Sequence, residues 1–71
     1  MIIDIDKAVT DYGIRSGRTL IGPNGLEAEI ISVNPQKREI ILKVGDKIYP
    51  PADLGKLAYN LLLGKGSVKG Q

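Results

Sequence analysis

The stretch LEAEIISVNPQKREIILKVGDKIYP, residues 26–50, decides the fold. In its first part Leu26, Ala28 and Ile30 fall on one face of an extended chain, and Glu27 and Glu29 fall on the other. The segment REIILKV repeats this alternation after the loop NPQK. Two alternating segments joined by a short loop predict an antiparallel pair with one face in the core and one in solvent.

The segment after this pair extends the sheet and then leaves it. Gly45 and Asp46 form a two-residue turn of the kind that hairpins prefer, so KIYP is predicted to be the third strand of a meander. Pro50 ends that strand because it has no N–H to donate, and Pro51 is suited to the first turn of a following helix. In that same first turn, Asp53 would complement the helix dipole.

A leucine-rich helix is predicted over about residues 52–63. Its apolar side chains share one stripe, which consists of Leu54, Leu57, Ala58, Leu61 and Leu62. Gly64 is the expected terminator. The tail KGSVKGQ, residues 65–71, is expected to be mobile unless Val68 anchors it.

The N-terminal part adds a helix and a strand. Apolar residues recur at helical spacing over about residues 6–12, with Asp4 or Asp6 as the N-cap and Gly13 as a left-handed C-cap. RTLI, residues 18–21, is a brief strand that the reverse turn GPNG stops. A short helix of this kind persists only when its apolar face docks on the rest of the domain.

These elements predict an α+β fold in one small domain spanning residues 1–71. A short N-terminal helix, an antiparallel meander of three to four strands and a C-terminal helix would pack with the helices on one face of the sheet. The alternative is a small SH3-like barrel of five strands. The length of the second helix argues against that barrel.

Composition excludes several kinds of chemistry. The 71 residues include neither cysteine nor histidine, which removes the commonest nucleophile, general base and metal ligands, so no enzyme, metal or cofactor is expected. The tail GKGS follows a helix, whereas a phosphate-binding loop precedes one. Asp4, Asp6 and Lys7 interrupt the apolar opening long before a signal peptide or membrane span could form, so we expect a soluble, cytoplasmic chain. Four charged side chains are expected on one solvated sheet face: Glu27, Glu29, Glu39 and Lys43.

Basic side chains on loops and strand ends are the candidates for phosphate contacts. Five are selected here: Arg15, Arg18, Lys47, Lys65 and Lys69. Tyr49, at the end of the third predicted strand, could stack on a base or close a pocket beside the second helix. With Pro51 it would border a base-reading site.

The order of these parts resembles the RAMA domain, a family named for its association with restriction enzymes and adenine methylases and proposed to read modified DNA. The resemblance lies in DYGIRSGRTL, in the strand that begins at LEAEI, and in GDKIYPPADLGKLAYNLLLGKGSVKG. Comparable places are occupied by Gly45, Tyr49, Pro51, Leu54, Gly64, Val68 and Gly70. PPA stands where the family has a Ser-Pro-Ser-like helix start, and the family's terminal tryptophan has no counterpart.

Two hypotheses of function follow. The resemblance implies a small DNA-binding module in which the five basic residues contact phosphate beside Tyr49 and Pro51. The alternative is a protein-interaction module, such as a phage or plasmid accessory or inhibitor protein that binds a host protein. Tyr59 and Leu63 lie off the main helical stripe, where they would be exposed to a partner or to a second copy of the chain. Basic side chains gathered around Tyr49 would favour DNA, and scattered ones around an apolar patch would favour a protein.

Overall fold

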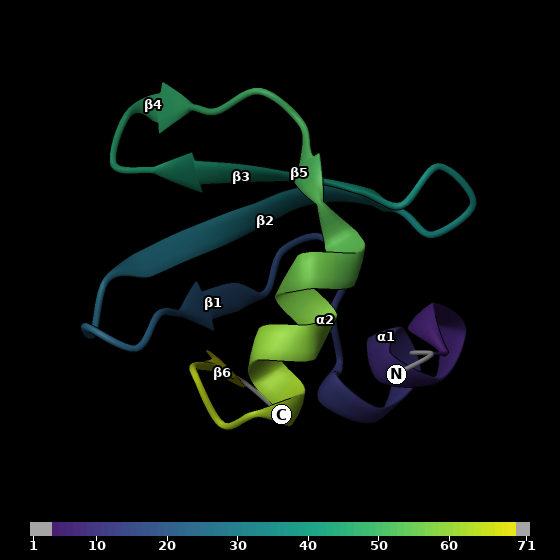
Figure 1. Cartoon of the computed structure of the whole chain (residues 1–71). Helices are drawn as coiled ribbons and strands as arrows, with labels where there is room; N and C mark the ends of the chain where they lie inside the picture. Colours follow the sequence, from purple (N-terminus) through teal and green to yellow (C-terminus); the bar gives the residue numbers. More distant parts are fainter. Residues whose placement is uncertain (1–3, 70–71) are drawn as a thin grey trace.

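The computed structural model describes residues 4–69 and confirms the predicted α+β class. Two helices accompany one antiparallel sheet, and Figure 1 shows α2 lying across the sheet with α1 to one side. In chain order the elements are α1 (Ile5–Tyr12), β1 (Thr19–Ile21), β2 (Glu27–Asn34), β3 (Glu39–Val44), β4 (Lys47–Ile48), β5 (Ala52–Asp53), α2 (Leu54–Leu62) and β6 (Ser67–Lys69).

The sheet has the strand order β4-β3-β2-β1-β6, with β5 also pairing with β3. The first four strands form the predicted meander, and β6 returns from the end of the chain to pair antiparallel with β1. This return is a barrel-like feature. In the part of the chain that the structure describes, however, the strand path ends at β4 and at β6, so the sheet is open.

Helix α1 has the two caps that the sequence predicts. The Asp4 side chain accepts a hydrogen bond from the backbone N–H of Lys7 at 3.1 Å, which satisfies one of the free donors of the first turn. Gly13 takes φ 66°, the left-handed conformation that glycine tolerates best, and ends the helix. Ile5 and Ala8 are buried, so the docked face holds this eight-residue helix in place.

The start of α2 differs from the prediction. We expected a helix from about residue 52 with Pro51 and Asp53 in its first turn, but the helix begins at Leu54 and Asp53 is its N-cap. The Asp53 Oδ1 atom accepts from the backbone N–H groups of Gly55 at 2.8 Å and Lys56 at 3.3 Å. The acidic side chain therefore caps the helix by direct hydrogen bonds.

The reason for the later start is the strand β5. Ala52 pairs with Ile40, and the backbone N–H of Leu54 donates to the carbonyl of Arg38 at 2.9 Å. These sheet hydrogen bonds hold residues 52–53 extended along β3. Backbone groups that are hydrogen-bonded to β3 cannot also form the hydrogen bonds of a helical turn, so the helix begins only at Leu54.

Residues 47–53 form one interrupted edge strand along β3. Lys43 pairs with Ile48 and Ile40 with Ala52, so three steps along β3 face four steps along the edge, and one extra residue is accommodated between them. The two prolines stand at this point, where they need no donor for the ladder. β4 itself ends at Ile48, earlier than the predicted KIYP strand, and the N–H of Tyr49 makes one more bond to β3. Pairing then stops at the prolines and resumes at Ala52.

The core lies between the sheet and the two helices. Ile14, Ile30, Ile40 and Leu54 are its largest fully buried side chains. Leu62, which we placed on the buried stripe, is instead 51% exposed. It lies about 80° around the helix axis from Leu54, whereas Leu61 lies only about 20° away and is buried. The core-facing stripe is therefore narrower than predicted.

Val68 anchors the C-terminal tail. It is buried and pairs with Leu20, so Ser67–Lys69 belong to the sheet. The tail was predicted to be mobile unless Val68 anchored it. Val68 does anchor it, so the predicted mobility does not apply to residues 67–69. The rest of that tail, residues 70–71, lies outside the described part, as does Gly70 of the RAMA resemblance. Within residues 4–69 neither helix has the length and apolar character needed to cross a membrane.

Candidate functional site

The register of the sheet sorts its side chains onto two faces, because directly opposite residues point the same way. The inner face carries buried Val68, Leu20 and Ala28, and its Leu20 and Val68 share one core cluster with Leu54 and Leu61 of α2. The outer face carries the alternate positions, which include Thr19 and Glu29. The two faces offer a ligand quite different chemistry.

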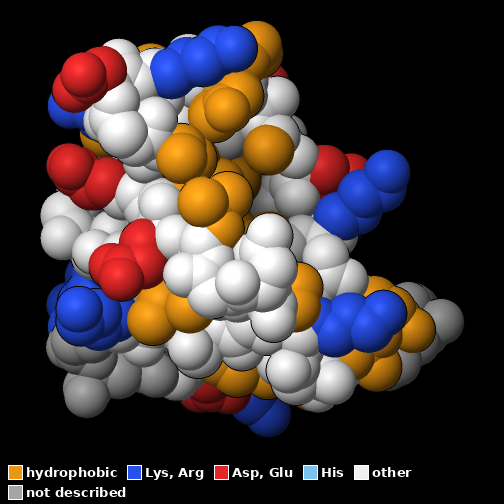
Figure 2. All heavy atoms as spheres, turned by 90° about the vertical axis from the view of Figure 1, so that its left-hand side faces the viewer, with side chains coloured by type: hydrophobic (Ala, Val, Ile, Leu, Met, Phe, Trp, Pro, Cys, Tyr) orange, Lys and Arg blue, Asp and Glu red, His pale blue; other side chains and the backbone are white. Residues whose placement is uncertain are grey.

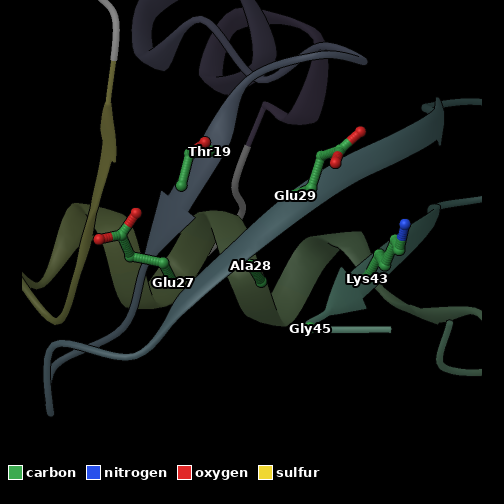
Figure 3. A pocket seen from close by; sticks show the side chains of 6 residues that line it. All are labelled: Thr19, Glu27, Ala28, Glu29, Lys43 and Gly45. Atoms are coloured by element: carbon green, nitrogen blue, oxygen red, sulfur yellow. The ribbon is translucent and has the colours of Figure 1, made fainter. Parts of the chain in front are cut away.

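A shallow hollow of about 210 Å³ lies on the outer face. It is lined by Thr19, Glu27, Ala28, Glu29, Lys43 and Gly45. Figure 3 shows the Thr19, Glu29 and Lys43 side chains on the side of the sheet away from α2. Glu29 and Lys43 are directly opposite in the register, which places an acidic side chain beside a basic one. Glu27 and Glu29 are exposed, so this face is solvated, as the sequence predicts.

The Lys47 and Tyr49 side chains lie together on the other face of the edge strand. The Lys47 Nζ atom is 5.0 Å from the centre of the Tyr49 ring, a cation–π contact. Tyr49 donates its backbone N–H to the carbonyl of Leu42 at 3.0 Å, which fixes the main chain at Tyr49 beside β3. The ring is still 42% exposed. Pro51, the other predicted neighbour of a base, is exposed two residues further along the same edge.

The other basic candidates lie elsewhere on the molecule. Arg15 and Arg18 are in the connection between α1 and β1, and Arg15 helps to line a cavity of about 250 Å³ at the end of α1. Lys69 is in β6, at the opposite end of the strand order from β4. Lys65 follows α2 and donates its backbone N–H to the carbonyl of Asn60 at 2.8 Å. The structure therefore brings Lys47 to Tyr49 and spreads the remaining four over other places.

An apolar surface that the sequence reasoning missed surrounds Tyr49. Leu42 lies opposite Tyr49, and Val44 lies opposite Lys47, so the alternation of β3 places all four side chains on the inner face. Leu42 and Val44 are only partly buried. Figure 1 shows why: the β3–β4 hairpin extends sideways beyond α2, which leaves this part of the inner face without a covering helix.

Leu57 of α2 completes this surface. Gly55 faces α1, since a Cβ on it would lie 3.7 Å from the Cδ1 atom of Ile5. Leu57 is two residues further on, about 200° around the axis, and therefore faces away from α1. Like Leu42, it is partly buried and packs against the core. We name Leu42, Val44, Tyr49 and Leu57 the apolar band. Figure 2, which looks at the left-hand side of Figure 1, shows apolar side chains exposed over the upper half of that side, with a Lys or Arg side chain across the top.

A second apolar surface lies on the far flank of α2. Tyr59, Leu62 and Leu63 are spaced three and four residues apart, so they share one side of the helix, and all three are exposed. We name them the helix stripe. The predicted exposure of Tyr59 and Leu63 is confirmed. Self-association through these residues remains a proposal.

The described residues offer surface chemistry rather than a buried polar site. Within residues 4–69 every buried side chain is apolar, and no group of three or more acidic side chains is placed to hold a metal ion. Comparisons of the chain with protein-family models, with curated proteins and with solved structures give no match. The resemblance to the RAMA domain therefore stays a prediction.

Proposed function

We propose that this chain is a non-catalytic protein-interaction module that binds its partner through the apolar band. The observation that supports this best is the position of Tyr49, which is held beside β3 by its backbone and yet exposes 42% of its surface next to Leu42 and Val44. A tyrosine side chain has only two rotatable torsions, so on a fixed backbone it can bury apolar area on binding with little loss of conformational entropy. Interface anchors commonly have this character.

The distribution of positive charge also favours a protein partner. A nucleic-acid site gathers several phosphate-binding side chains along one face, because each neutralised phosphate adds affinity. Here Lys47 lies against Tyr49, whereas Arg15 and Arg18 follow α1 and Lys69 is at the other end of the sheet. Apolar contact is the interaction that the surroundings of Tyr49 provide.

DNA binding is the second candidate. The Lys47–Tyr49 pair supports it, since an exposed ring can stack on a base while a neighbouring ammonium group contacts phosphate. Such binding would weaken steeply with added salt. Titration of the chain with methylated and unmethylated duplexes at two salt concentrations tests it. Salt-sensitive binding lost on Lys47→Ala would replace the protein-interaction proposal.

Selection from a random-peptide library on the folded chain tests the main proposal. We expect the enriched peptides to bind the wild type and to lose about tenfold or more in affinity for Tyr49→Ser, because an anchor side chain is removed. Ile48→Ser is the matched control: Ile48 is the adjacent residue, is 59% exposed, and lies on the outer face opposite Lys43. Peptides that bind Tyr49→Ser as well as the wild type would contradict the proposal.

A further inference from the structure

We propose that Asn24 and Gly25, in the turn between β1 and β2, form a site of spontaneous covalent modification. The backbone nitrogen of Gly25 attacks the side-chain amide of Asn24, and the asparagine becomes aspartate or isoaspartate. Water is the co-reactant. The site lies apart from the apolar band, so this inference is independent of the proposed function.

The three asparagines of the chain differ in the residue that follows or in the element that holds them. Asn24 precedes Gly25, which has no side chain to obstruct attack by its own nitrogen. Asn34 precedes Pro35, which has no N–H, and Asn60 lies within α2, where the helix fixes the main chain. Ring closure needs an N–H that can lose its proton and a main chain that can move. Of the three asparagines, Asn24 meets both conditions.

The turn that holds Asn24 is exposed and is closed by two backbone hydrogen bonds. All residues from Pro23 to Leu26 are exposed, and Figure 1 shows this turn at the left-hand end of the sheet. The Gly22 N–H donates to the carbonyl of Leu26 at 2.8 Å, and the Gly25 N–H donates to the carbonyl of Gly22 at 2.9 Å. Only the second bond must open before Gly25 reacts. An exposed turn opens in this way at low cost.

The side-chain carbonyl of Asn24 is already bonded to a donor. Its Oδ1 atom accepts the backbone N–H of Leu26 at 3.1 Å. This donor withdraws electron density from the carbonyl, and it stabilises the negative charge that develops on Oδ1 when the Gly25 nitrogen attacks. The turn therefore supplies both the attacking nitrogen and a donor for the oxygen of the group that is attacked.

The reaction consumes a water molecule and releases ammonia. The Gly25 nitrogen bonds to Cγ of Asn24, the bond from Cγ to the side-chain nitrogen breaks, and the Gly25 proton passes through solvent to the departing ammonia. Water then opens the cyclic imide. Opening between Cγ and the Gly25 nitrogen leaves aspartate. Opening at the main-chain carbonyl leaves isoaspartate, in which the chain runs through Cβ and Cγ.

Isoaspartate should loosen the start of β6, because it lengthens the main chain of a turn that β6 contacts. Gly22, where the turn begins, lies beside Gly66: a Cβ on Gly66 would be 3.8 Å from the Gly22 Cα atom and 2.7 Å from the carbonyl oxygen of Ile21. A shift of Gly22 therefore disturbs this close approach. Aspartate keeps the chain length and can still accept from the N–H of Leu26, so it should leave β6 in place.

Peptide mapping of the folded chain by mass spectrometry, after incubation at mildly alkaline pH, tests the site. We expect the Asn24 peptide to gain about 1 Da and to separate into two chromatographic forms, while the Asn34 and Asn60 peptides stay unchanged. The rate should rise with pH, because the Gly25 nitrogen must lose its proton. It should be no more than about tenfold below the rate in guanidinium chloride, the factor that one net backbone hydrogen bond contributes. A rate far below that limit, or equal conversion at Asn34 or Asn60, would overturn the inference.

Variants test the mechanism and its consequence separately. Gly25→Ala should slow the conversion several-fold, because a methyl group beside the nitrogen obstructs ring closure. Gly45→Ala, at another turn glycine with positive φ and open space around it, should leave the rate unchanged. Amide exchange at Val68 should be faster in the isoaspartate form than in the wild type, and unchanged in freshly purified Asn24→Asp. A rate that Gly25→Ala does not alter would refute the mechanism, and equal exchange at Val68 in all three forms would refute the loosening of β6.

Discussion

The two faces of the sheet come from the same strands and yet offer opposite chemistry. On the outer face Glu29 stands opposite Lys43, and the hollow there is lined mostly by polar groups. The inner face is mainly apolar, with Lys47 at its edge, and α2 covers only part of it because the helix is nine residues long and the β3–β4 hairpin extends beyond it. The feature that distinguishes this molecule is therefore the part of the apolar inner face that α2 leaves uncovered, and not the polar hollow on the outer face.

The largest effect is expected where the inner face is covered. Leu54 is fully buried, so Leu54→Ala should lower the free energy of unfolding by about 2–5 kcal/mol. Ile48→Ala, on the exposed outer side, should change it by no more than about 0.5 kcal/mol. Urea denaturation measures both. If Leu54→Ala does not fold, Ile40→Val at another fully buried site should cost about 0.5–1.5 kcal/mol. If Leu54→Ala and Ile48→Ala lowered the free energy of unfolding equally, the buried inner side and the exposed outer side would not differ in their contribution to stability.

The next effect concerns the edge at β6. A Cβ on Gly66 would lie 2.7 Å from the carbonyl oxygen of Ile21, and its φ is 129°, so Gly66→Ala should cost more than about 1 kcal/mol and loosen β6. Gly25→Ala is the control, because Gly25 also has a positive φ but has open space around it. Thermal unfolding and amide exchange at Val68 report the two effects. A Gly66→Ala variant as stable as Gly25→Ala would refute the close approach.

A smaller effect should follow from loss of the α2 cap. Asp53→Ala removes the acceptor for two backbone N–H groups and should cost about 1 kcal/mol, within roughly 0.5–2 kcal/mol. Asp53→Asn should retain most of that stability, since asparagine caps nearly as well. Asp46→Ala, in the β3–β4 turn, controls for loss of an acidic side chain. Equal stability of the wild type and Asp53→Ala would mean that α2 starts elsewhere.

The smallest effect is expected on the outer face. Coupling between Glu29 and Lys43 should be about 0.2–1 kcal/mol in a double-mutant cycle to alanine, because cross-strand charge pairs in solvent are weak and screened. The cycle uses urea unfolding of the two single variants and the double variant. A coupling several times larger would show that this face is more than a solvated surface.

Local patterns in the sequence predict much of this fold. The cap at Asp4, the left-handed Gly13, the Gly45–Asp46 turn and the alternation of β2 and β3 each depend on residues close together in the chain. Interactions between residues close in the chain produce residue types and spacings that can be recognised in the sequence. These features are confirmed for that reason.

Features that depend on distant contacts could not be read in the same way. The pairing of Ala52 with Ile40 delays α2, and the pairing of Val68 with Leu20 turns the expected tail into a strand. The apolar band depends on where a short helix lies across the sheet, which no spacing rule specifies. Even so, the position of Val44 and Tyr49 on the alternating inner face was a signal that could have indicated it.

The most direct test of the proposed binding surface is methyl NMR of the chain titrated with a peptide enriched in the library selection. Leu42, Val44 and Leu57 carry methyl groups in the apolar band, and Ile21 and Ile41 carry them on the outer face of the sheet. We expect the largest shift changes on Leu42, Val44 and Leu57, and no change on Ile21 and Ile41. Changes centred on the outer face or on the helix stripe would contradict it.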